Sequence, residues 1–114
     1  MSRGLQAVTV LVFGALRRWM DEKGFPYVLE RQVPNQGVPA HDMAEGIGIP
    51  AKEIEAVFRN GRVINIHDRV HPGDRVAFFP YGTPGPYRVF LGMARENKNR
   101  VEREKAMAEA KNRT

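Results

Sequence analysis

The stretch "AVFRNGRVINIHDRVHPGDRVAFFP", residues 56–80, decides the fold. Two β-rich arms flank Asn60-Gly61, the dipeptide that type I′ hairpin turns prefer because both residues tolerate positive φ. Turn residues follow at 71–74, and the run from Arg75 to Phe79 predicts a last strand that is stopped by Pro80. The stretch therefore predicts a hairpin followed by a further strand.

The residues before the hairpin predict two strands and one helix. Residues 7–13, AVTVLVF, are apolar on both faces, which is typical of a central strand, and a short helical turn or loop follows at 15–24. Residues 27–34, YVLERQVP, are half polar, which favours an edge strand. Residues 35–54 contain a short amphipathic helix that ends near Gly46 and cannot continue past Pro50. Strands packed around one helix predict an α+β domain with a mixed sheet.

Composition limits the classes of function. The chain has 114 residues, the size of one domain, and is 42% hydrophobic. It has no cysteine, which excludes disulfides and cysteine nucleophiles and fits a cytoplasmic protein. The apolar run at 7–16 is shorter than the about 18 residues that a membrane span needs, so we expect no membrane partner.

The C-terminal part reads as a connector and a helix. Gly and Pro residues dominate 81–86, and residues 87–114 are helix-like. Tyr87, Val89, Phe90 and Leu91 are apolar enough to dock on the sheet or on a second copy, which would give a homodimer. Val101 shares a helical face with Phe90, and beyond it the apolar stripe thins, which predicts a solvated or frayed end. This end also carries more than half of the net charge of +5.

Residues 7–80 resemble the MoaD/ThiS family of small sulfur carriers. The most specific part is Asn60-Gly61-Arg62, then Asp68, Gly73-Asp74-Arg75-Val76 and Phe79-Pro80. The resemblance implies a β-grasp, ubiquitin-like fold, with residues 1–80 as the domain, 81–86 as the connector and 87–114 as a helical extension. It also implies a place among proteins of molybdopterin or thiamine biosynthesis, as a protein-interaction module and not an enzyme.

The resemblance further implies which residues bind a partner. In the family, a C-terminal Gly-Gly carboxylate is adenylated by a ThiF/MoeB-type enzyme and converted to a thiocarboxylate. Here residues 81–86 read YGTPGP, no Gly-Gly is present, and the chain continues past Pro86. We therefore expect an inactive carrier, unless cleavage after Gly85 frees a carboxylate. The resemblance assigns contacts with the adenylating enzyme or a cofactor synthase subunit to Phe79, Pro80, Tyr81, Gly82 and Gly85, and core packing is the alternative for Phe79.

A second hypothesis is an RNA-binding module. The β-grasp TGS domains share the arrangement of residues 60–76, and Arg17-Arg18-Trp19 could form a stacking platform for nucleic acid beside the basic tail. The alternative reading is a tryptophan half-buried over the core with the arginines at its rim. We favour that alternative, so a nucleic-acid partner is the less favoured hypothesis.

Histidines suggest no catalytic or metal centre. His67 and His71 are four residues apart, with Asp68, Asp74 and distant His41 as further candidate ligands, but Pro72-Gly73 favours a surface turn. His41-Asp42 has no nucleophile to serve, since Ser2 is the only serine, and Asp42 more simply favours a helix N-terminus. We expect no metal and no cofactor.

Overall fold

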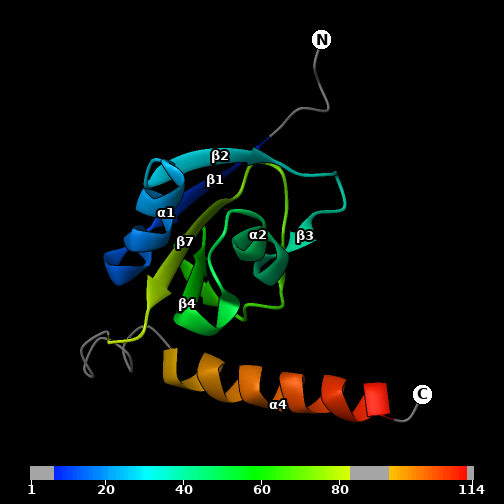
Figure 1. The fold of residues 1–114 in the computed structure, drawn as a ribbon. Helices are drawn as coiled ribbons and strands as arrows, with labels where there is room; N and C mark the ends of the chain where they lie inside the picture. Colours follow the sequence, from blue (N-terminus) through cyan, green and yellow to red (C-terminus); the bar gives the residue numbers. More distant parts are fainter. Residues whose placement is uncertain (1–6, 83–92, 113–114) are drawn as a thin grey trace.

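The computed structural model describes residues 7–82 and 93–112 (Figure 1). In the final helix, side chains are described for residues 98–111. The elements are β1 (Ala7–Val12), η1 (Gly14–Leu16), α1 (Arg17–Lys23), β2 (Val28–Gln32), β3 (Val38–Pro39), α2 (Ala40–Gly46), η2 (Ala51–Glu53), β4 (Ile54–Arg59), β5 (Arg62–Ile64), β6 (Arg69–Val70), β7 (Arg75–Pro80) and α4 (Met93–Asn112).

A five-stranded mixed sheet forms the centre of the described fold. Its strand order is β2-β1-β7-β4-β5, with β1 and β7 parallel and the other neighbours antiparallel. The prediction of a central first strand and an edge second strand is confirmed. In Figure 1, α2 lies across one face of this sheet. The α+β architecture, a mixed sheet packed on a helix, is therefore confirmed.

The core lies between α2 and the sheet. In β1, Val8, Val10 and Val12 are buried, because alternate residues of a strand point to the same face. They join Phe78 of β7 and residues of α2 in one hydrophobic cluster. Each fully buried side chain of this size contributes about 1.5–3 kcal/mol to folding.

The hairpin turn has the backbone that its sequence predicts. Asn60 has a φ of 53° and Gly61 a φ of 84°, so both residues adopt the left-handed region. The Asn60 side chain also donates to Asp74 Oδ1 at 3.0 Å and accepts from the Arg75 backbone N–H at 2.9 Å. The turn is thereby joined to the start of β7.

A small second sheet was not predicted from the sequence. Val38 of β3 pairs with Val70 of β6 in an antiparallel ladder of two strands. The Arg69 guanidinium donates to the Gly37 carbonyl at 2.8 Å and closes this corner of the fold. Two-residue strands have no readable alternation, so the sequence carries no signal for them.

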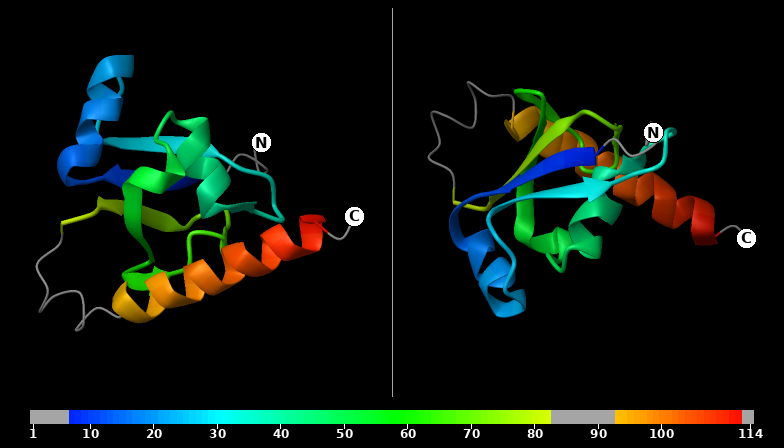
Figure 2. Two further views of the ribbon diagram at one scale, coloured as in Figure 1. Left: turned by 60° about the horizontal axis from the view of Figure 1, so that its bottom comes forward. Right: turned by 90° about the horizontal axis from the view of Figure 1, so that it is seen from above.

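The side chains described in α4 meet the domain through polar groups. Val101 is 63% exposed, and the side chains that contact the domain include Arg100, Arg103 and Glu104. The prediction of a solvated helix end is confirmed for residues 101–111, which are exposed, and the helix continues to Asn112 along the domain (Figure 2). Tyr87, Val89, Phe90 and Leu91 lie outside the described residues.

None of the helices among residues 7–82 and 93–112 has the length and apolar character of a membrane-spanning segment.

Candidate functional site: the outer face of the sheet

The face of the sheet opposite α2 carries an aromatic cluster. The rings of Phe13 and Phe79 stack with centroids 4.7 Å apart and planes 2° apart. Phe58 meets Phe79 edge-on, with centroids 5.1 Å apart. All three rings are half-buried and lie outside the hydrophobic core. Such pairs contribute about 0.5–1.5 kcal/mol beyond the burial of their area.

A shallow apolar groove runs between these rings. Its volume is about 270 Å³, and it is lined by Leu11, Phe13, Phe58, Gly61, Arg75, Ala77 and Phe79. We call Leu11, Phe13, Phe58, Ala77 and Phe79 the aromatic face. The aromatic face arises from the alternation of side chains along a strand. Its residues in β4, in β7 and in the segment of β1 alternate with residues whose side chains point into the core.

The residues assigned to partner binding occupy three different settings. Phe79 belongs to the aromatic face and is not one of the core residues, unlike its buried neighbour Phe78. Pro80 pairs with Ile54 at the end of β7, and Tyr81 is 57% exposed. Gly82 has a φ of 105°, which favours glycine. Gly85 lies outside the described residues.

One cleft contains residues from both predicted sites, the partner-binding site and the nucleic-acid site. Arg18 and Trp19 lie with Pro80 and Tyr81 around a cavity of about 170 Å³. The Arg18 guanidinium lies 4.9 Å from the centre of the Trp19 ring, and Trp19 is packed against the core. The cleft therefore joins the α1 segment to the end of β7.

Arg17 lies apart from this cleft. Its guanidinium is 4.7 Å from the centre of the Tyr27 ring and 5.9 Å from that of Phe13, and its Nε donates to the Val12 carbonyl at 3.0 Å. The Tyr27 hydroxyl donates to Asp21 at 2.6 Å, and this hydrogen bond raises the pKa of Tyr27. Arg17 thus packs its cation on rings beside the aromatic face.

The histidines and their neighbouring carboxylates take structural positions. His67 stacks on His41 with centroids 5.5 Å apart, and its Nε2 is 2.9 Å from a Glu104 oxygen. Asp68 accepts from the Asn65 backbone N–H at 3.0 Å, and Asp74 accepts from that of His71 at 2.8 Å. Within the part of the chain that the structure describes, no three His, Asp or Glu residues are grouped to hold a metal ion.

Four residues of the aromatic face were not predicted from the sequence as functional candidates: Leu11, Phe13, Phe58 and Ala77. A signal was present, because residues 7–13 are apolar on both faces while one short helix can cover only one of them. We interpreted the second apolar face as the mark of a central strand. The structure shows that it also supplies a partly exposed apolar surface.

Comparison with known protein families indicates a ubiquitin-like domain. Residues 6–84 match the family model described as Mut7-C ubiquitin. Among solved structures, the chain is similar to the solution structure of the Haloferax volcanii HVO 2177 protein, with 18% identity and a TM-score of 0.49 over 72% of this chain and 89% of that one. No curated protein matches the chain.

Proposed function

This chain belongs to the Mut7-C ubiquitin family, and from that premise we propose that it is a non-catalytic protein-interaction module. In this proposal the aromatic face and the end of β7 bind a partner protein. The observation that carries it is the stacked pair Phe13 and Phe79, which is partly exposed on the face opposite the helix-covered core. Exposed apolar patches with aromatic anchors are typical of protein-binding surfaces.

The proposed partner is an adenylating enzyme of the ThiF/MoeB type or a cofactor synthase subunit. The resemblance to sulfur carriers of molybdopterin and thiamine biosynthesis supports this choice, because those proteins bind through the sheet face and the C-terminal strand. In this chain Phe79 belongs to both, since it is the next-to-last residue of β7 and lines the groove. The sheet face and the end of β7 would therefore form one continuous partner-binding surface.

We propose that the chain does not itself carry sulfur unless it is processed. Adenylation needs a free carboxylate, and the carbonyls of Gly82 and Gly85 are each bound in a peptide linkage to the next residue. Cleavage after Gly85 would free one, but Pro86 makes that bond a poor substrate for most proteases.

The RNA-binding alternative has less support. Arg17 and Arg18 lie over aromatic rings, and Arg100 and Arg103 bond to the domain. These four cations therefore already contact groups of the chain itself. A TGS-like module would need such cations to contact the phosphates of RNA.

The proposal is tested by calorimetry, which measures the affinity of the full chain for a purified adenylating enzyme from the same organism. We expect Phe58→Ser to weaken binding at least about tenfold, because it removes an aromatic anchor without touching the core. Val101→Ser is the matched control, since it removes an exposed apolar side chain elsewhere. Unchanged affinity of a folded Phe58→Ser variant contradicts the proposal.

Two further measurements separate the alternatives. Binding of tRNA that falls steeply between about 50 and 200 mM salt would favour the TGS-like reading. The intact mass of the protein from its own cell distinguishes an inactive module from a processed carrier. A species that ends at Gly85 with sulfur in place of one oxygen would restore the carrier function.

A further inference from the structure

We propose that the free edge of β2, together with the groove between β2 and α2, binds an extended segment of a partner protein as an added strand. The segment has apolar side chains on one face and a carboxylate opposite Arg31. This surface lies on the helix-covered side of the sheet, away from the aromatic face, so the proposal does not rest on the one above.

Among the residues that the structure describes, no strand pairs with the outer edge of β2. β2 pairs with β1 and ends the strand order on that side. The Val12 backbone N–H donates to the Tyr27 carbonyl at 2.9 Å, so the main-chain N–H and C=O groups of Tyr27 point toward β1. By alternation, those of Leu29 and Arg31 point toward β1 as well. The N–H and C=O groups of Val28, Glu30 and Gln32 therefore point away from the sheet. Such a row is a template for an extended chain.

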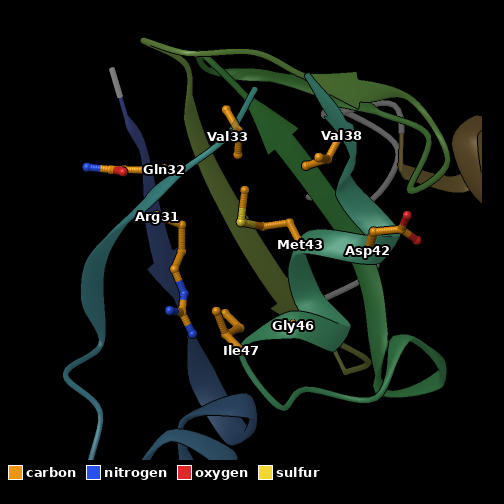
Figure 3. A pocket seen from close by; sticks show the side chains of 8 residues that line it. All are labelled: Arg31, Gln32, Val33, Val38, Asp42, Met43, Gly46 and Ile47. Carbon is orange, nitrogen blue, oxygen red and sulfur yellow. The ribbon is translucent and has the colours of Figure 1, made fainter. Parts of the chain in front are cut away.

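An apolar groove lies beside this edge. It has a volume of about 260 Å³ and is lined by Arg31, Gln32, Val33, Val38, Asp42, Met43, Gly46 and Ile47. Figure 3 shows the side chains of Val33, Val38 and Met43 directed into it, while those of Gln32 and Asp42 point away. Side chains on the inner face of an added strand would enter this groove.

Arg31 gives the groove its charge preference. Its side chain runs along the groove toward Ile47 (Figure 3), and its guanidinium lies 5.6 Å from the centre of the Phe25 ring. Within residues 7–82 and 98–111, no carboxylate forms an ion pair with it. The chain as a whole carries a net charge of +5, which also favours an acidic partner.

The pattern of the segment follows from strand geometry. On the free side of β2, Leu29 and Arg31 occupy non-hydrogen-bonded positions, where directly opposed Cα atoms approach to about 4.5 Å. A carboxylate opposite Arg31 would form a cross-strand ion pair, and apolar residues two positions away on either side would face Leu29 and Val33. The segment therefore reads apolar, acidic, apolar at alternate positions.

Fluorescence anisotropy with a labelled peptide tests the proposal on the full chain. The probe is Ser-Ile-Thr-Glu-Ser-Ile-Thr-amide with a fluorophore on its N-terminal amine, and its second, fourth and sixth side chains share one face. Glu30→Pro removes an outward N–H but no bond to β1, and we expect it to weaken binding at least about tenfold. Glu30→Gln is the control for the lost charge and keeps binding within about threefold.

A charge swap tests the pairing with Arg31. Arg31→Glu should weaken binding of the probe about tenfold, and a probe with Lys in place of Glu should recover most of this loss. Thermal melting of each variant verifies that it is folded. Absence of binding, equal binding by folded Glu30→Pro, or no recovery in the swap would each overturn the proposal. So would a dimer in light scattering that Glu30→Pro abolishes, because the edge would then pair with a second copy.

Discussion

Arg100 of α4 donates a hydrogen bond of 2.6 Å to the backbone carbonyl of Ile54, 46 residues earlier in the chain. A second nitrogen of the same guanidinium donates to the Ala51 carbonyl at 3.0 Å. Arg100 thus bonds one carbonyl at the start of η2 and one at the start of β4, and its side chain is only 12% exposed. Among the residues whose side chains are described, polar contacts of this kind attach the helix to the domain.

Arg100→Ala should release α4 while leaving the sheet folded. Hydrogen bonds from a charged donor contribute about 1.5–3 kcal/mol, and the substitution removes two of them. Amide hydrogen exchange should become faster in residues 98–111 and stay unchanged in β1 and β7. Lys105→Ala, on an exposed position of the same helix, should change neither. Faster exchange throughout the sheet would contradict a purely local role.

Acid should weaken the attachment of α4. Partial burial raises the pKa of Glu104, but hydrogen bonds with His67 and Arg100 outweigh it and hold the pKa below its ordinary value of 4.5. A lowered carboxyl pKa gives stability that is present above the ordinary value and lost as the pH falls through the folded one. The protection of the α4 amides against hydrogen exchange, taken relative to the intrinsic rate at each pH, should therefore fall below about pH 4.5.

Glu104→Gln provides the control for this effect. It cannot ionise, so the step below pH 4.5 should disappear while exchange at neutral pH is already faster than in the wild type. Glu104 is partly exposed, so the change should be small. An identical acid step in this variant would assign the titration to another group.

Phe78 and Phe79 should differ in their effect on stability. Phe78 is completely buried, and Phe78→Ala should lower the free energy of unfolding by about 3–5 kcal/mol. Phe79 lies half-buried on the outer face, so Phe79→Ala should cost about 1–2 kcal/mol, mainly through the lost stacking on Phe13. Urea unfolding measures both. Equal losses would mean that Phe79 acts as a core residue.

Gly37 should tolerate no side chain. Its φ is 78°, and a Cβ atom there would collide with the Val70 carbonyl oxygen and the His71 ring. Gly37→Ala should lower the free energy of unfolding by about 2 kcal/mol or more. Gly24→Ala is the matched control, since Gly24 has a φ of 73° but no atom within 4 Å of the added Cβ. If both variants lose the same stability, the collision contributes nothing.

Local signals in the sequence predicted most elements of the domain. Asn60-Gly61 predicted the hairpin, because a turn of two positive φ angles depends on those two residues alone. Gly46 and Pro50 predicted where α2 ends, because each also acts through its own backbone preference. The half-polar alternation of 27–34 predicted the edge position of β2, since only one face of that strand meets the core.

The candidate surfaces were only partly predictable. The motif at the end of β7 identified Phe79, but nothing in its neighbourhood indicated Phe13, 66 residues earlier, as its stacking partner. The groove beside β2 needs α2 to lie next to that strand, and its lining spans residues 31–47. Both surfaces combine residues of separate elements, which only the packing of the chain brings together.

The amino-acid sequence by itself determined the strands, the hairpin turn and the short helix, because each follows from backbone preferences and from alternation over a few residues. Only the tertiary structure decided how α4 meets the domain. Helical periodicity placed Val101 on one face with Phe90 but indicated nothing about Arg100, which donates to the carbonyls of Ala51 and Ile54. Backbone carbonyls are present at every residue, so the sequence gives no sign of which ones a distant arginine will reach.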